Sequence, residues 1–412
     1  MFKRLKLYFS ERALVIGELL TGREGSDYDP ISQGRFAFAP DESLFAWSCG
    51  FRKLVLVPWS KYKSRLHSQE GDSFGSSFLS ERISIDAGFQ VCSLAFGTGV
   101  PDGNLSHLKR DYWTRFNFSQ DLTLATGHIN GRIRIWDPYT GKLLLELTDH
   151  KFAVNSLAFA HDGSLRLASG SQDGTIKVWD LSDDGNMFKT LSDKTKIAFR
   201  DLSWSPNSKL LCSVGIKQKA FLWNMEEYSL HKRLVGHLND VNASSFSPDG
   251  ALVATASSDT TVIIWDTNSG EILRFLNHTS PPPGVIYMSG VNDFYVKGVS
   301  FSQNGCQLIS TCSDGILRFW DLTNGNFPEE IGTGNDDDMM LLCSYSPDGG
   351  SVAVCFASGS TIFYKSPTKI PSLLHLCRTA VRKALKSSVV EEMENTLSLP
   401  RTLYPFLRYQ DW

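Results

Sequence analysis

The sequence predicts an all-β protein of seven similar units, followed by a small α-helical segment near the C-terminus. Two observations lead to this prediction. Segments that end in Trp-Asp or a close variant recur at separations of mostly 42 to 44 residues, and such a period is typical of repeat architectures. After residue 366 the alternating pattern stops, and apolar residues recur three and four positions apart, as on one face of a helix.

The repeat is defined by an aromatic residue at a fixed place in each unit. Five units carry it in GRIRIWD, GTIKVWD, QKAFLWN, TTVIIWD and GILRFWD, at Trp136, Trp179, Trp223, Trp265 and Trp320. Two further copies flank this set, with Trp59 of RKLVLVPWS and Tyr364 of STIFYKS at the matching position. Residues 31–366 are therefore predicted to contain seven units.

Each unit contains short strands joined by tight turns. VNASSFSP alternates between apolar and polar residues, and an Asp-Gly turn separates it from a second strand, ALVATASS. The turn motif SPDG occurs at 247–250 and again at 346–349. This pattern predicts a series of antiparallel hairpins.

These units resemble WD repeats, so the resemblance implies a seven-bladed WD-repeat β-propeller, whose closed ring has no exposed sheet edges. Two units carry the full polar set of that motif, namely His150, Ser169, Asp173 and Trp179 in the third and His237, Thr255, Asp259 and Trp265 in the fifth. The second unit has Asn130 in the Asp position, and the sixth keeps Ser310, Asp314 and Trp320 without an obvious His. Because the set recurs with a packed Trp at a fixed offset, we interpret it as a structural hydrogen-bond network and not as a catalytic one.

Closing the ring requires one more strand. The seventh unit passes from TIFYKS directly into the tail, so it lacks an outer strand of its own. Within the N-terminal segment 1–30, residues 12–19 (RALVIGEL) can supply that strand, and a disordered leader is the alternative. A cleaved targeting peptide is not favoured, because charged residues interrupt the apolar run and no small-residue cleavage site follows.

Three insertions lengthen the units, at 60–82, 97–119 and 277–295. Loops on a rigid scaffold often bind partners, but they also tolerate sequence drift. A binding role and a role as variable connections therefore both stay open for these insertions. The acidic segment GTGNDDDMM (332–340) lacks the spacing of a calcium-binding loop and is interpreted as a solvated turn.

No motif of an enzyme active site, a metal site or a cofactor site occurs, so we predict a binding protein that needs no cofactor. The net charge of −3 gives no reason to expect nucleic acid as a partner. No apolar run is long enough to span a membrane. The eight cysteines lack CxxC spacing and several lie in apolar strands, which favours reduced thiols in the cytosol or nucleus.

The tail, 367–412, is basic and helical in pattern. PSLLHLCRTAVRKAL begins at a Pro-Ser helix start and gathers its apolar residues on one face, with arginines and lysines opposite. So short a segment cannot bury these faces by itself. It either docks on the ring or binds another chain.

The tail resembles a SOCS box. The pattern Ser372-Leu373-xxx-Cys377-xxx-Val381 is similar to an elongin-C-binding box, which implies that Leu373, Leu376, Cys377, Ala380 and Val381 contact elongin C. The segment LSLP is similar to the cullin-selecting Leu-Pro-x-Pro element, with Ser398 in place of the first Pro. By this resemblance the cullin-binding residues are Leu397, Leu399, Pro400 and Leu403.

A propeller followed by such a tail resembles the WD-repeat and SOCS-box-containing proteins over nearly the whole chain. The three consecutive prolines at 281–283 favour the first of the two vertebrate paralogues in that family. The resemblance implies a non-catalytic substrate receptor of an ECS-type cullin–RING ubiquitin ligase, with elongin B/C and a cullin-5-type scaffold as partners. The alternative is a WD-repeat scaffold without ligase function, whose tail is a docked helical cap.

Overall fold

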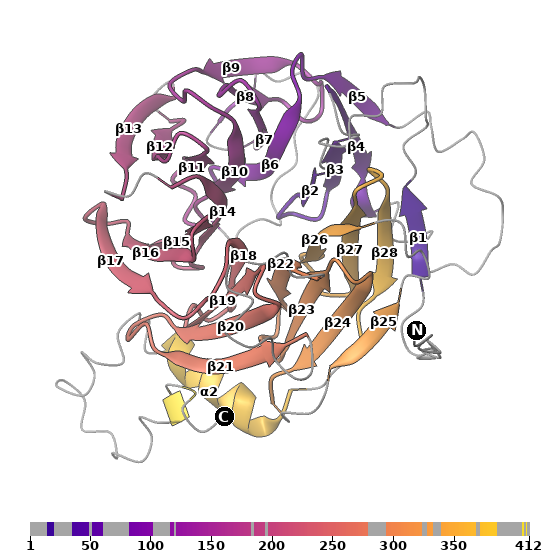
Figure 1. Ribbon diagram of the computed structural model, residues 1–412. Coiled ribbons are helices and arrows are strands. Elements are labelled where there is room, and N and C mark those ends of the chain that lie inside the picture. Colours follow the sequence, from indigo (N-terminus) through magenta and orange to yellow (C-terminus); the bar gives the residue numbers. More distant parts are fainter. Residues whose placement is uncertain are drawn as a thin grey trace.

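The protein is a ring of seven four-stranded antiparallel sheets, with one α-helix docked against it (Figure 1). The computed structural model describes residues 15–19, 35–48, 52–60, 82–101, 116–118, 121–182, 185–193, 197–278, 294–323, 328–332, 339–367, 371–384, 406–407 and 409. Most of the three insertions and the acidic turn fall outside these residues.

Each sheet forms one blade, and six blades take their four strands in chain order from the centre of the ring outwards. Blades one to three consist of β2 (Arg35–Phe38), β3 (Leu44–Ser48), β4 (Lys53–Pro58) and β5 (Ile83–Asp86); β6 (Val91–Thr98), β7 (Leu122–His128), β8 (Ile133–Trp136) and β9 (Leu143–Leu147); and β10 (Val154–Phe159), β11 (Arg166–Ser171), β12 (Ile176–Asp180) and β13 (Asn186–Leu191).

Blades four to six repeat this order. They consist of β14 (Phe199–Trp204), β15 (Leu210–Gly215), β16 (Lys219–Asn224) and β17 (Ser229–Leu234); β18 (Val241–Phe246), β19 (Leu252–Ser257), β20 (Thr261–Asp266) and β21 (Ile272–Asn277); and β22 (Val296–Phe301), β23 (Gln307–Cys312), β24 (Ile316–Asp321) and β25 (Glu329–Gly332).

Blade seven is built from both ends of the propeller sequence. Strands β26 (Met340–Tyr345), β27 (Ser351–Phe356) and β28 (Thr361–Lys365) are followed in space by β1 (Val15–Leu19). Strand β1 pairs antiparallel with β28, from Val15 opposite Tyr364 to Leu19 opposite Thr361. The N-terminal strand therefore supplies the outer strand that the seventh unit lacks.

Hydrophobic clusters between neighbouring blades hold the ring together. The structure contains seven such clusters among its described residues, one between each pair of adjacent blades. The cluster between blades seven and one is rich in aromatic rings. There Trp59 lies 4.9 Å from Phe38 and 5.1 Å from Phe363, measured between ring centroids. These rings join the last blade to the first, and burial of such side chains is the main stabilising contribution.

The register of blade one corrects one sequence prediction. In blade six the repeat tryptophan, Trp320, pairs with Leu308, the second residue of the preceding strand. The corresponding residue of blade one, Phe45, pairs with Val57. Val57 therefore occupies the repeat position, and Trp59 lies two residues beyond it, after β4 has ended. Trp59 packs against Phe38 of its own blade and Phe363 of blade seven.

Candidate protein-binding site

The C-terminal helix α2 (Leu373–Ala384) begins at a capping serine. The backbone N–H of His375 donates to Ser372 Oγ at 3.2 Å, which satisfies one of the free amides of the first turn. Pro371 precedes this serine and agrees with a helix start. The helix lies against the ring beside blades five and six (Figure 1).

Helix α2 docks on the propeller through its polar side. His375, Arg378 and Arg382 are spaced three and four residues apart, and all three are almost fully buried. His375 Nε2 lies 2.8 Å from the carbonyl oxygen of Asn304, in the turn between β22 and β23. The Arg382 guanidinium lies 3.1 Å from the carboxylate of Asp249, in the turn between β18 and β19. The helix thus spans two blades.

The last described residues of the chain complete this docking. The guanidinium of Arg378 stacks on two aromatic rings, 4.4 Å from the centroid of Phe406 and 4.3 Å from that of Tyr409. Arg382 donates to the carbonyl oxygen of Leu407 at 2.7 Å. The Tyr409 hydroxyl donates to Asp249 at 2.7 Å, and burial raises the pKa of this hydroxyl. Both arginines are therefore enclosed between the ring and the chain end.

The opposite side of α2 is apolar and open to solvent. Leu373 is 77% exposed, and Leu374, Leu376 and Val381 are between 39% and 59% exposed. Cys377 and Ala380 are also exposed. All five residues predicted to contact elongin C therefore lie on accessible surface. Several large apolar side chains gathered on one exposed helix face indicate a protein-binding surface.

The predicted cullin-binding residues cannot be placed in this way. Leu397, Leu399, Pro400 and Leu403 lie outside the described part of the chain. Their assignment depends on the sequence alone.

The structure joins the polar residues of the third and fifth units into matching networks. In blade five His237 Nε2 lies 2.7 Å from Thr255 Oγ1, and His237 Nδ1 lies 2.8 Å from the Asp259 carboxylate. Trp265 Nε1 donates to the same Thr255 hydroxyl at 2.8 Å. Every member is buried and hydrogen-bonded, which stabilises the blade.

Blade three repeats this arrangement. His150 Nε2 lies 2.7 Å from Ser169 Oγ, and His150 Nδ1 lies 2.8 Å from Asp173. Trp179 Nε1 donates to Ser169 Oγ at 2.8 Å. Burial lowers the pKa of His150, and its hydrogen bond to Asp173 opposes that shift.

Two further histidines complete networks that sequence reasoning missed. In blade six His278 Nε2 lies 2.7 Å from Ser310 Oγ, so the sixth unit does have its histidine. His278 is the second residue of the insertion 277–295, which separates it from β22 and obscures the repeat spacing. In blade two His128 Nε2 lies 2.9 Å from Thr126 Oγ1, which also accepts from Trp136 Nε1. This histidine comes from β7 itself and not from the connection before the blade.

Asn130 and Asp314, which occupy the aspartate positions of units two and six, bond elsewhere. Asn130 Oδ1 accepts from the backbone N–H of Arg132 in the turn between β7 and β8. Asp314 pairs with Arg318 at 2.7 Å. Neither contact reaches the histidine of its blade.

The described residues contain no group of three or more histidines, cysteines or acidic residues that could hold a metal ion. Within the same part of the chain, no helix has the length and apolar character required to cross a membrane. The candidate site is the exposed face of α2, presented by the ring on which the helix is docked.

Comparison with known proteins supplies independent evidence on this architecture. The family model for the WD domain, G-beta repeat, matches residues 141–180, 228–266 and 288–321. The human WD repeat and SOCS box-containing protein 1 is 44% identical, with 97% of this chain and 96% of that protein aligned. The proteins of the same name from Xenopus tropicalis and Danio rerio are each 43% identical, with 97% and 91% of this chain and 96% and 90% of those proteins aligned.

Proposed function

Since the chain belongs to the WD repeat and SOCS box-containing proteins, we propose that it is the substrate-recognition subunit of an ECS-type cullin–RING ubiquitin ligase. The propeller binds a substrate protein, and the C-terminal box recruits elongin C together with elongin B. A cullin-5-type scaffold then brings a RING subunit. The outcome is ubiquitination of the substrate and its degradation by the proteasome.

One observation carries this proposal: one face of α2 is docked on the ring, and the other face is exposed to solvent. The docked side uses His375, Arg378 and Arg382, so the apolar side remains available to a partner. That side carries the residues of the box that resembles an elongin-C-binding motif. Transfer of one Leu side chain from water to an apolar pocket contributes about 1.5–3 kcal/mol, so Leu373, the most exposed of them, is the main anchor.

The chain takes no part in the chemistry of ubiquitin transfer. Formation of the isopeptide bond takes place on other subunits, and this subunit contributes proximity and orientation. Both raise the effective concentration of substrate lysines near the ubiquitin donor without a catalytic residue here. The seven described cysteines are free thiols, which agrees with a reducing compartment such as the cytosol or nucleus.

Choice of the cullin is assigned to residues 397–403. Leu397, Leu399, Pro400 and Leu403 are proposed to contact the scaffold, by resemblance to the cullin-selecting element. Ser398 replaces a proline of that element, and serine lacks the fixed φ of proline.

The competing function is a scaffold whose tail only caps the ring. A cap explains the buried side of α2, but it gives no reason for the exposed leucines. The two functions differ in whether purified elongin B–elongin C complex binds the full chain. We expect capture by the wild type and at least a tenfold loss for the double variant Leu373→Ala, Cys377→Ala.

The matched control is Val235→Ala, which truncates an equally exposed apolar residue after β17. This variant should capture the elongin complex as the wild type does. Undiminished capture by the Leu373→Ala, Cys377→Ala variant means that the ligase proposal is wrong and the cap alone remains.

A further inference from the structure

The innermost strands of the propeller share a local irregularity. In β6, β10, β14, β18, β22 and β26 the pairing register shifts by one residue at the second position of the strand. A residue at such a bulge is unpaired, and its side chain is re-aimed. The six bulged residues are Cys92, Asn155, Arg200, Asn242, Lys297 and Leu341.

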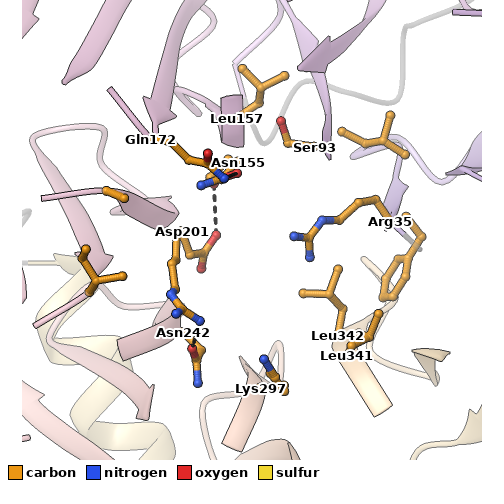
Figure 2. A pocket seen from close by; sticks show the side chains of 16 residues that line it. Arg35, Ser93, Asn155, Leu157, Gln172, Asp201, Asn242, Lys297, Leu341 and Leu342 are labelled. Carbon is orange, nitrogen blue, oxygen red and sulfur yellow. Dashed lines mark hydrogen bonds between the residues drawn. The ribbon is translucent and has the colours of Figure 1, made fainter. Parts of the chain in front are cut away.

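All of these residues except Cys92 line a pocket at the centre of the ring, which we call the channel mouth. Its volume is about 590 Å³, and all seven innermost strands contribute to its wall, β2 through Arg35. Figure 2 shows Arg35 across the pocket from Asp201, with Lys297 and Asn242 at its lower side. A space of this size accommodates one or two side chains of a bound peptide.

Three cations line the channel mouth, although the whole chain carries a net charge of −3. Arg200 is held in place, because its guanidinium contacts the Asp240 carboxylate at 2.8 Å and the Asn242 side-chain oxygen at 2.8 Å. Arg35 donates through Nε to the carbonyl oxygen of Cys92 at 2.7 Å. Both guanidinium groups are therefore pre-positioned before any ligand binds.

Lys297 is the third cation. Within the described part of the chain its ammonium forms no ion pair, and it lies 4.6 Å from the centroid of the Tyr295 ring. Partial burial beside Arg200 and Arg35 lowers the pKa of Lys297 to about 8. An anion between these three side chains would stabilise the charged ammonium.

The carboxylate of Asp201 also lines the channel mouth, and two hydrogen bonds hold it in place. One of its oxygens accepts from Ser156 Oγ at 3.0 Å, and the other accepts from the backbone N–H of Ser244 at 2.8 Å. Asp201 thereby ties β14 to the innermost strands on either side of it. The pKa of this carboxyl is raised because it is removed from water. Counting Asp240 beside Arg200, two carboxylates face the three cations, so the channel mouth keeps a surplus of positive charge that attracts anions.

We propose that the channel mouth binds an anionic side chain of a substrate peptide, with Arg35, Arg200 and Lys297 as its contacts. This inference rests on the proposed function in that it names the chemistry of the substrate segment. Carboxylate and phosphate groups both supply the required charge, and a phosphate brings more charge and more acceptor oxygens. The three cations also attract acidic segments during encounter.

The test measures binding of short peptides to the full chain without elongin. Three fluorescein-labelled ten-residue peptides share one Gly/Ser sequence and carry Glu-Glu, a phosphoserine or Gln-Gln at the centre. By fluorescence anisotropy we expect at least one anionic peptide to bind ten times more tightly than the Gln-Gln peptide, with affinity falling as salt is raised. The better anionic peptide identifies the preferred group.

Variants locate the binding to the channel mouth. Lys297→Gln and Arg200→Gln should each weaken anionic-peptide binding at least fivefold, whereas Arg200→Lys keeps most of it because the charge remains. Lys189→Gln is the matched control, because Lys189 is exposed on the outer strand β13. For the wild type, affinity should also fall between pH 7 and pH 9, as Lys297 loses its proton.

Three results overturn the inference. They are equal affinity for the anionic and neutral peptides, an equal loss in Lys189→Gln and Lys297→Gln, and no binding of any peptide at about 1 mM. Capture of elongin B–elongin C is measured on the same variants and reports on folding. Because capture depends on α2 and peptide binding on the channel mouth, either proposal can fail while the other holds.

Discussion

The guanidinium of Arg382 and the carboxylate of Asp249 form an ion pair of 3.1 Å that is almost completely buried, and it joins the C-terminal helix to a turn of blade five. A buried charge that loses its partner is strongly destabilising. The pair is reinforced from the chain end, since Leu407 and Tyr409 bond to the same two side chains.

Arg382→Met should therefore release α2 from the ring. The loss of the buried partner of Asp249 costs about 3–5 kcal/mol, which is enough to undock a single helix while the blades stay folded. Hydrogen exchange of the α2 amides should become much faster, and that of the β19 and β20 amides should not. Lys209→Met is the control, because the Lys209–Glu226 pair is exposed and contributes at most about 1 kcal/mol. Unchanged protection of α2 in Arg382→Met would contradict this role of the pair.

Two leucines of the tail should respond in opposite ways to the same substitution. Leu373→Asp changes a side chain that is 77% exposed, so the free energy of unfolding should stay within about 0.5 kcal/mol of the wild type. Leu407→Asp places a charge where the side chain is buried, and it should undock the chain end. Thermal unfolding and limited proteolysis of the tail compare the two. A clear drop in melting temperature for Leu373→Asp would mean that its apolar surface is already covered within the chain.

The hydroxyl of Thr255 should matter far more than its methyl group. Thr255→Val keeps the shape of the side chain but removes the partner of both His237 and Trp265, at a cost of about 1–3 kcal/mol for each group left unpaired. Thr361→Val is the matched control, since the Thr361 hydroxyl is buried without a hydrogen-bond partner among the described residues. Urea titrations should show a large loss for the first variant and none for the second. Equal losses of stability in the two variants would mean that the hydrogen-bond network does not stabilise the blade.

Stability should fall in mild acid because of His128. Burial, with Arg134 nearby, lowers the pKa of His128 to about 4 in the folded protein, whereas an unfolded histidine titrates near 6.5. Between these values the unfolded state binds more protons, so stability is full above pH 6.5 and decreases as the pH is lowered toward 4. The loss from this residue is about 2 kcal/mol between pH 7 and pH 5. Urea midpoints of His128→Gln should depend less on pH than those of the wild type, and an identical pH dependence would refute the assignment.

The repeated part of the fold could be read from the sequence because hairpin turns and the repeat tryptophan follow local rules. Trp59 was placed wrongly because the sequence WS at that point mimics the end of a repeat strand, whereas the pairing of Phe45 with Val57 fixes the register. His278 was missed because it lies at the start of an insertion, and the sequence alone does not show its contact with Ser310.

The candidate site could be predicted only in part for a related reason. Helical spacing identified the apolar face of α2, but it could not tell which face docks on the ring. That choice depends on Asp249 and the carbonyl of Asn304, which lie far from the helix in sequence. The channel mouth was not predicted, because its cations come from separate blades, and two of them, Arg200 and Lys297, lie at bulges that leave no sequence motif.

The pairing of β1 with β28 has a consequence for biosynthesis. Strand β1 leaves the ribosome first, but its partner is made about 340 residues later, a delay of roughly 17 to 70 seconds at ordinary rates of translation. Until the two meet, a nascent chain with six finished blades presents open hydrogen-bonding edges that can pair with other chains. The final step of folding is thus a long-range encounter, and the interval before it is when this protein most needs a chaperone.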